Sequence, residues 1–230
     1  MPGLGRVQYW DVRNEKFPLD VSLLSRARLA IARSLGIADP RNWRQWRRYF
    51  QRQTPRCTAF GTATQVAADP IHQTTGWLDR TFTEAGLEQL YQDIRAEDRR
   101  NGRVFDEGGT TLAAMEVGKA RGWWNRYEWA TSFEALRTWV HNSASIVVGS
   151  NWYASSWDVN AENICPMPKP GEPPAGGHLY VLRGYDPKRD LFTHPTTWNM
   201  GDIKMPGELV RRLIAEDGEA AFPYEVKLSP

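Results

Sequence analysis

The segment Gln51–Gly61, which reads QRQTPRCTAFG, constrains the fold of this chain more than any other stretch. It places Cys57, one of two cysteines in the chain, at the start of the small apolar run CTAFGTATQVAA, which is compatible with a helix. Thr54 is a suitable N-cap and Pro55 a suitable first helical residue, because proline has no N–H to leave unpaired there. Cys57 is then expected in the first turn of a helix.

The position of Cys57 admits two interpretations. The unpaired amides and the positive end of the dipole at a helix N-terminus favour a thiolate, which is the nucleophilic form of cysteine. Upstream, Gln51 adds a neutral hydrogen-bond donor. A free cysteine is, however, also among the residues most often buried as a small hydrophobe. This stretch alone leaves both a nucleophile and a packing residue open.

Composition excludes several classes of protein. The chain has 230 residues, 41% of them hydrophobic, and a net charge of +2, so it can bury a core and its charge does not by itself indicate a polyanion partner. Two cysteines rule out a disulfide scaffold. The four histidines (His72, His141, His178 and His194) fit no zinc-binding spacing, and we expect no metal and no cofactor.

Our expectation for the location of the protein depends on two sequence signals, a membrane-spanning segment and a signal peptide. No apolar run approaches the roughly 20 residues that span a membrane. The first residues, MPGLGRVQYWDVRNEK, contain no apolar core of a signal peptide. We therefore expect a cytoplasmic protein or a component of a macromolecular particle.

The first half of the sequence predicts mainly helices. Residues 1–18 are expected to form an extended arm, with VQYWDV as a short strand. Helices are expected over residues 20–35, 41–53, 57–68, 87–94, 110–121 and 132–141, from their apolar spacing, N-caps and glycine stops. The charged run RAEDRRNGR, residues 95–103, is interpreted as a solvated surface.

The predicted helix over residues 41–53 is basic and rich in tryptophan. Arg41, Arg44, Arg48 and Arg52 share one face, and Trp43, Trp46 and Phe50 share another. A basic amphipathic helix can bind nucleic acid. Because the overall charge is nearly balanced, we favour a core-facing aromatic stripe with a solvated basic face.

Strands dominate the second half. ASIVVGSNWY predicts a buried strand, and the proline-rich loop Cys165–Pro174 follows it. HLYVLRGYD and LFTHPTTW predict an antiparallel hairpin, a helix is expected from Pro206 to Gly218, and AFPYEVKL predicts a last strand. Helices followed by strands indicate an α+β fold in which a helical lobe packs against a β lobe.

Four blocks of residues, in this order and spacing, resemble the papain-like cysteine peptidases, in a divergent form of bacterial or phage type. They are Gln51, Cys57, Ala59 and Phe60; Gly108-Gly109 with Ala114; His178 with Gly184-Tyr185; and the tryptophan-containing turn of LFTHPTTW. The resemblance covers residues 51–200. It implies a two-lobe fold with a cleft between a helical lobe, about 51–142, and an antiparallel β lobe, about 143–230. Residues 1–50 are expected to pack on this domain as an arm and added helices that are not removed.

The resemblance also implies a function. The chain would hydrolyse a peptide or amide bond through a thioester, with Cys57 as nucleophile, His178 as base and Gln51 as oxyanion donor. Its substrate-binding residues would be Gly108, Gly109, Gly177 and Trp198. The expected partner is a peptide or peptide-like substrate, with a further protein partner left open and neither nucleic acid nor membrane expected.

Departures from the family pattern concern the third catalytic role. The asparagine that orients the base in this family is replaced by Thr196, and the nearest asparagine is Asn199, directly after Trp198. Either Thr196 or Asn199 orients His178, or the role is lost. This departure favours an alternative, in which the fold serves as a structural or docking module in a larger, for instance viral, assembly.

Other positions also differ from the family. Thr54 replaces the cysteine of a neighbouring disulfide, and Thr110 and Thr111 stand where a substrate pocket tends to be apolar. We therefore do not expect a bulky apolar side chain to be preferred in that pocket. Cys165 is left open as a surface thiol or a residue of the cleft rim.

Overall fold

The computed structural model describes residues 4–7, 39–72, 82–130 and 132–225. Its elements are β1 Arg41–Asn42, α2 Cys57–Val66, α4 Glu84–Arg100, α5 Thr111–Ala120, β2 Trp124–Trp129, α6 Phe133–Asn142, β3 Ile146–Trp152, the 3-10 helix η3 Ala154–Trp157, β4 Gly176–Leu182, β5 Gly184–Asp186, β6 Leu191–Pro195, β7 Asp202–Pro206, α7 Gly207–Ala215 and β8 Glu219–Glu225. The strands form two four-stranded sheets, in the orders β2-β8-β3-β4 and β1-β5-β6-β7. Every pairing within them is antiparallel.

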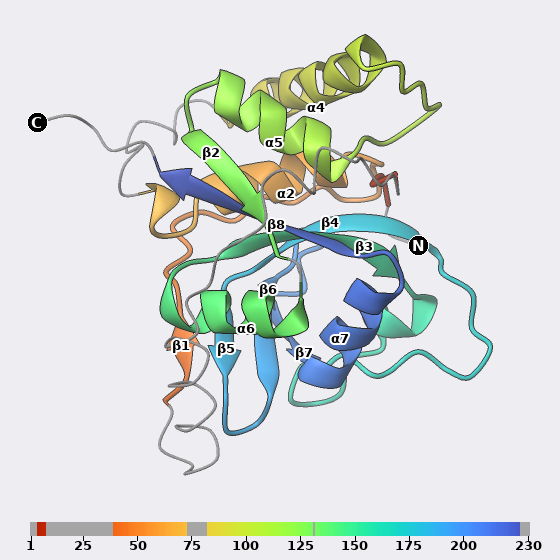
Figure 1. The fold of residues 1–230 in the computed structure, drawn as a ribbon. Helices are drawn as coiled ribbons and strands as arrows, with labels where there is room; N and C mark the ends of the chain where they lie inside the picture. Colours follow the sequence, from red (N-terminus) through yellow and green to blue (C-terminus); the bar gives the residue numbers. More distant parts are fainter. Residues whose placement is uncertain (1–3, 8–38, 73–81, 131, 226–230) are drawn as a thin grey trace, which may run out of the picture.

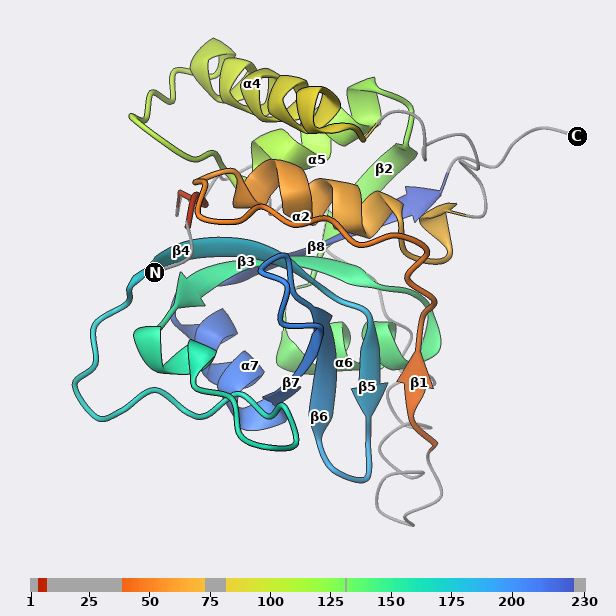
Figure 2. The same cartoon turned by 180° about the vertical axis from the view of Figure 1, so that it is seen from behind.

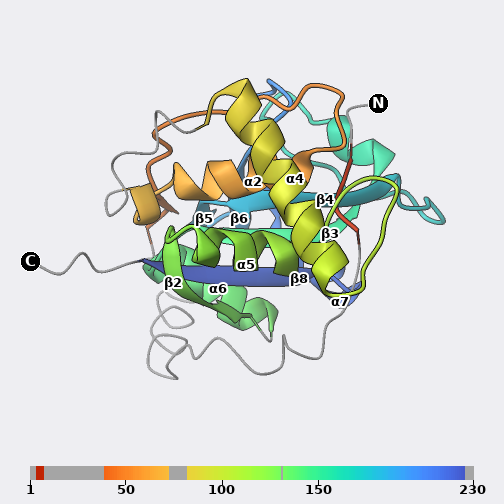
Figure 3. The ribbon, with the colours of Figure 1, turned by 90° about the horizontal axis from the view of Figure 1, so that it is seen from above.

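The sheet β2-β8-β3-β4 separates two hydrophobic cores. Helices α2, α4 and α5 cover its upper face, and α6, α7 and the second sheet lie below it (Figures 1 and 3). Side chains alternate between the cores along each strand, as a pleated strand requires. Val147 and Leu179 belong to the upper core, and Val148 and Tyr180 to the lower one. The fold is therefore α+β with two lobes, as predicted, although strand β2 comes from the helical half.

Helix α2 lies at the centre of the molecule, and all ten of its residues are buried. Gly61 faces β4 so closely that an added Cβ would lie 2.3 Å from Cδ2 and 2.8 Å from the carbonyl oxygen of Leu179. A glycine at this position therefore lets the helix pack directly on the strand. Figure 2 shows α2 lying along β4 from the other side.

Several predicted elements are confirmed. In α4 the buried face contains Leu87, Leu90, Tyr91 and Ile94. Helix α6 begins after Ser132, whose hydroxyl accepts from the amide of Ala135 at 3.1 Å. Helices α5 and α7 and strands β3 and β8 also lie where expected, whereas β2 and β7 were not predicted.

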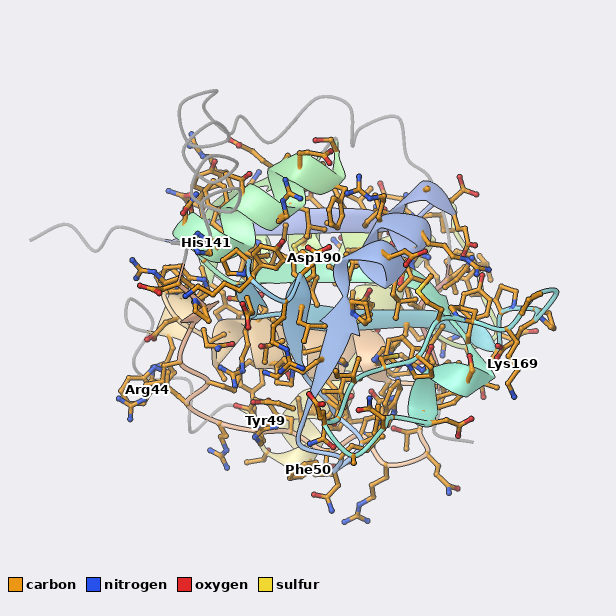
Figure 4. The ribbon with its side chains drawn as sticks, turned by 90° about the horizontal axis from the view of Figure 1, so that it is seen from below. Arg44, Tyr49, Phe50, His141, Lys169 and Asp190 are labelled. Carbon is orange, nitrogen blue, oxygen red and sulfur yellow. The ribbon has the colours of Figure 1, made fainter. Side chains whose placement is uncertain are left out.

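The predicted helix over residues 41–53 is wrong. The segment is extended: its amides at Trp43 and Trp46 donate to the carbonyls of Arg183 at 2.7 Å and Ala67 at 2.9 Å. Trp46 and Phe50 are 42% and 43% exposed, so there is no core-facing aromatic stripe. In Figure 4 the segment is seen from below, with Phe50 at the edge of the molecule. Long-range backbone pairing has overridden a helical spacing of arginines and aromatics.

Two local predictions also need correction. Helix α2 begins at Cys57 with Arg56 as an N-cap whose side chain makes no capping bond, so Thr54 is not the cap. The hydroxyl of Thr54 instead donates to the carbonyl of Gln51 at 2.7 Å, within a turn before the helix.

The predicted hairpin of HLYVLRGYD and LFTHPTTW is correct only in part. The first segment divides at Arg183 into β4, which pairs with β3, and β5, which pairs with β6. The chain thus passes at Arg183 from the sheet between the two cores, which contains β4, to the second sheet, which contains β5.

The expected helix over residues 20–35 and the strand VQYWDV lie outside the described residues, apart from Val7. None of the described helices has the length and apolar character needed to cross a membrane.

Gly61→Ala tests the contact between α2 and β4. The added methyl group would meet backbone as well as side-chain atoms of Leu179. We expect the free energy of unfolding to fall by about 1–3 kcal/mol in urea denaturation. Ala85→Ser, at an exposed position of α4, is the control and should change it by less than about 0.5 kcal/mol. A Gly61→Ala protein as stable as the control would contradict this packing.

Candidate active site

Cys57 lies at the N-terminus of α2, where the helix meets β4. It is fully buried, with 0% exposed. Its Sγ atom accepts from the amide of Leu179 at 3.5 Å and from the amide of Gly5 at 3.2 Å. The residue that precedes Leu179 is His178, so the backbones of the predicted nucleophile and base lie close together, but no hydrogen bond joins Sγ to the His178 ring among the described residues.

A turn before α2 holds Gln51 against the end of β6. The backbone amide of Gln51 donates to the carbonyl of Thr197 at 2.9 Å, and the Thr197 hydroxyl donates to Oε1 of Gln51 at 2.7 Å. The side-chain amide of Gln51 donates to the carbonyl of Thr54 at 3.1 Å. Gln51 is thus held in place by hydrogen bonds of its backbone and of both ends of its side chain.

The loop at Gly108-Gly109 is held by buried polar groups. The amide of Gly108 donates to the Tyr91 hydroxyl at 2.8 Å. The Asp98 carboxylate accepts from the Thr110 amide at 2.9 Å and hydroxyl at 2.7 Å, and pairs with Nε of Arg103 at 2.8 Å. Asp98 and Arg103 are 1% and 5% exposed. Interpreting residues 95–103 as a solvated surface was therefore wrong at Asp98 and Arg103, and sequence spacing had given no sign of their role.

Residues 4–7 lie between Gly109 and Gly177 and form backbone hydrogen bonds with both. The Arg6 amide donates to the carbonyl of Gly177 at 3.1 Å. On the opposite side, the Val7 amide donates to the carbonyl of Gly109 at 2.8 Å, and the Gly109 amide donates to the carbonyl of Gly5 at 2.8 Å. Figures 1 and 2 show this short red segment between the end of α2 and β4. Gly109 and Gly177, two of the predicted substrate-binding residues, thus pair with a polypeptide backbone.

The close fit of this segment depends on glycine. A Cβ added at Gly5 would lie 1.8 Å from the carbonyl oxygen of Pro55, and one added at Gly108 would lie 2.0 Å from the carbonyl oxygen of Gly5. The atom that Gly5 presents to Sγ is an amide nitrogen, not a carbonyl carbon. Residues 4–7 therefore place a backbone amide, and no carbonyl carbon, against Sγ of Cys57.

Burial raises the pKa of the Cys57 thiol from 9.0 to about 11. The hydrogen bonds from the Leu179 and Gly5 amides and the charge of Arg6 act in the opposite direction but are weaker than burial. The helix N-terminus alone was expected to favour the thiolate. With residues 4–7 in place, Cys57 is instead a protonated thiol near neutral pH.

His178 lies on β4 among aromatic rings and is completely buried. Its ring stacks on Trp198 with 4.3 Å between centroids and 23° between planes, and it makes a T-shaped contact with Trp152 with 5.1 Å between centroids. Neither ring nitrogen has a hydrogen-bond partner among the described residues. Burial, and then the nearby His194, hold the pKa of His178 well below 6.5, so the imidazole is neutral.

The residues expected to orient the base make other contacts. The Thr196 hydroxyl donates to the Gly201 carbonyl at 3.0 Å and accepts from the Met200 amide at 3.3 Å. Asn199 is exposed and has a positive φ of 62° in the same turn. In this conformation Trp198, between these two residues, contacts the imidazole.

Cys165 lies in the lower core, not on the surface or at the cleft rim. It is 0% exposed, its thiol donates to the carbonyl of Ser156 at 3.4 Å, and burial raises its pKa to about 11. It acts as a packing residue. Within the described part of the chain, no cluster of three or more His, Cys, Asp or Glu side chains is arranged to hold a metal ion.

Asp98→Asn tests the support of the Gly108-Gly109 loop. The change removes the charge that compensates the buried Arg103. We expect a loss of about 3–5 kcal/mol in the free energy of unfolding. Asp93→Asn is a matched control, because the Asp93–Arg121 pair is partly exposed, at 37% and 24% of the side chains. It should cost less than about 1 kcal/mol; similar losses in both variants would show that Asp98 has no special role.

Acid stability tests the neutral histidines. Burial lowers the pKa of His194 to about 4 and that of His178 well below 6.5. As pH falls from about 6.5 towards 4, the unfolded chain binds protons that the native chain does not. The free energy of unfolding should therefore fall by about 1.4 kcal/mol per pH unit for each histidine.

His194→Gln should remove one histidine's share of this slope. His141→Gln, at the half-exposed end of α6, is the control. Urea denaturation at a series of pH values measures both, and a slope that His194→Gln leaves unchanged would contradict the burial of a neutral imidazole.

Comparison with known proteins gives a fold. No protein-family description matches the sequence, and a search of curated proteins finds no significant match. Solved structures do match. Xylellain, a cysteine protease from Xylella fastidiosa, aligns with a TM-score of 0.72 and 17% identity over 98% of this chain and 97% of that chain. Procathepsin L2 proteinase from Tenebrio molitor larval midgut aligns at 0.61 and 13% identity, over 97% and 78%.

A third structure is similar over less of this chain. The Carica candamarcensis cysteine protease CMS1MS2, solved in complex with E-64, aligns with a TM-score of 0.54 and 12% identity over 81% of this chain and 100% of that chain. The shared feature of these structures is the two-lobe architecture described above. The chain has the fold of the papain-like cysteine proteases.

Proposed function

We propose that this chain is a cysteine-dependent hydrolase that cleaves peptide or amide bonds, and that residues 4–7 keep it latent. The observation that carries the proposal is the extended segment bound over Cys57. Its backbone pairs with Gly109 on one side and Gly177 on the other, and its amide lies 3.2 Å from Sγ. The cleft is therefore built to hold a polypeptide chain against a thiol.

The reaction follows from the groups at this point of the fold. The His178 ring first turns from Trp198 towards Cys57 and takes the proton of the thiol, and the thiolate then forms a bond to the substrate carbonyl carbon. The C–N bond then breaks, the leaving amine takes the proton from His178, and water hydrolyses the thioester to the acid. The Cys57 amide and the Gln51 side chain stabilise the oxyanion, at about 2.7–4 kcal/mol for a donor of this kind.

Latency has a steric and an electrostatic part. Residues 4–7 fill the place proposed for the substrate, and the burial of Cys57 disfavours the thiolate. Withdrawal of the segment re-exposes Sγ to water, which removes the largest cause of the raised pKa. The amides at the N-terminus of α2 then favour the reactive form.

A second candidate is a docking module without catalysis. It is favoured by the contacts of Thr196, whose hydroxyl bonds within its own turn and not to His178. Nucleic-acid binding loses its basis, because residues 41–53 do not form the basic amphipathic helix on which it depended.

Reactivity of Cys57 distinguishes hydrolase from module. Gly5→Ala in the full-length chain places a methyl group against the Pro55 carbonyl and should displace the segment. We expect an epoxide thiol probe to label Cys57 of this variant at pH 7 at least about tenfold faster than Cys57 of the unaltered protein and faster than a free thiol. Mass spectrometry of the labelled peptides measures both rates.

Three controls make the result specific. Cys57→Ala should abolish labelling, since Cys165 is buried, and His178→Ala should slow it in the Gly5→Ala background. Arg211→Ala, a surface change on α7, should react like the unaltered protein. The hydrolase is wrong if Cys57 of the Gly5→Ala protein reacts no faster than a free thiol and is indifferent to His178→Ala.

A further inference from the structure

A second buried histidine, His194, lies beside the proposed base. It belongs to strand β6, whose end packs against β4, the strand that carries His178 (Figures 1 and 2). The centroids of the two imidazole rings are 6.1 Å apart, with 67° between the ring planes. Both residues are completely buried. Two ionisable rings thus lie close together, although the proposed reaction uses only one of them.

The backbone fixes the tautomer of His194. Its Nδ1 atom lies 3.1 Å from the carbonyl oxygen of Val181. A carbonyl oxygen can only accept a hydrogen bond, so Nδ1 carries the hydrogen. Burial lowers the pKa of His194 to about 4, and the ring is therefore neutral near pH 7. Its Nε2 atom presents a lone pair and is a hydrogen-bond acceptor.

This acceptor has no hydrogen-bond partner among the described residues. An unpaired buried acceptor is unfavourable, and most buried polar atoms in proteins do have a partner. An aliphatic side chain would fill the same place without this cost, so packing does not explain a histidine here. Two rings with unpaired nitrogens lie near it, His178 and Trp152, with centroids 6.1 Å and 6.0 Å away.

The proposed reaction gives His178 an N–H group that needs an acceptor. Once His178 has taken the thiol proton, both of its ring nitrogens are donors. One faces the thiolate of Cys57, and the other needs a partner, because an unpaired charged donor is costly in a buried site. The residue at the family's asparagine position, Thr196, uses its hydroxyl within its own turn. His178 therefore needs an acceptor from elsewhere.

His194 is placed to provide this acceptor. It precedes Thr196 by two positions, and residues two apart in an extended chain point to the same side. Ring bonds of about 1.3–1.4 Å place each nitrogen about 1 Å from the ring centre. With a hydrogen bond of about 3 Å between them, two such rings have centroids about 5 Å apart. From their present 6.1 Å the rings need to approach by about 1 Å, which the turn of His178 away from Trp198 can supply.

We propose that His194 is the positioning residue of this site, and that its Nε2 atom accepts a hydrogen bond from the His178 ring and holds the imidazolium against Cys57. This inference rests on the proposed hydrolase and assigns the role that Thr196 does not fill. The acceptor has to be a neutral ring, because a second cation would repel the imidazolium. Around His194, Asp202 raises its pKa and Arg48 lowers it, but burial is the largest effect and keeps it neutral.

Amide side chains separate this role from a structural one. The asparagine amide reaches the place of Nδ1 and can keep the bond to the Val181 carbonyl, whereas the glutamine amide places its oxygen where Nε2 lies. The test measures how fast an epoxide thiol probe labels Cys57 of the full-length Gly5→Ala protein at pH 7. We expect His194→Asn to slow labelling at least about tenfold and His194→Gln to keep the rate within about threefold. A structural role through Val181 predicts the opposite order.

A double-mutant cycle shows whether His194 acts through His178. In the Gly5→Ala/His178→Ala protein, His194→Asn should cause no further loss of rate, because the ring that it positions is absent. Phe192→Leu, at an equally buried position two residues earlier on β6, is the matched control for a disturbed core. It should leave the labelling rate unchanged. Urea denaturation verifies that each variant is folded.

The outcomes separate this inference from the proposed function. Fast labelling that depends on His178 but survives His194→Asn leaves the hydrolase standing and overturns the positioning role. An effect of His194→Asn that persists in the His178→Ala background also overturns it, because His194 would then act through another residue such as Trp152. Labelling of Cys57 no faster than that of a free thiol, and independent of His178, overturns the hydrolase and with it the role of His194.

Discussion

The contact between α2 and β4 is the constraint on which the rest of the site depends. Gly61 has no side chain, and this lets the helix settle on the backbone of Leu179. Cys57 precedes Gly61 by one helical turn and so lies on the same face of α2. The packing that places Gly61 against one side of Leu179 therefore places Sγ against its amide. The position of Cys57 therefore follows from the packing of the core.

Two opposing effects act on the thiol at this position. A helix N-terminus favours an anion by about 0.3–1 kcal/mol and up to about 2 kcal/mol where it is partly buried. Burial raises the pKa of Cys57 from 9.0 to about 11, which corresponds to about 3 kcal/mol against the thiolate after the local hydrogen bonds have acted. Desolvation is therefore the larger of the two effects. Cys57 combines the burial of a packing residue with a position at a helix N-terminus, which favours a thiolate, so both interpretations of the sequence have a structural basis.

Sequence reasoning worked where a signal is local. The apolar spacing of α4, the Ser132 cap of α6 and the run that forms β3 each depend on neighbouring residues, and all were predicted correctly. The predictions were wrong where the interacting residues are far apart in the sequence. Residues 41–53 have helical spacing, but their backbone groups pair with residues such as Ala67 and Arg183. Likewise Asp98 looked like part of a solvated run, because the loop that it supports follows ten or more positions later. The buried ion pair between Arg6 and Glu219 could not be predicted, because the two residues lie at opposite ends of the sequence.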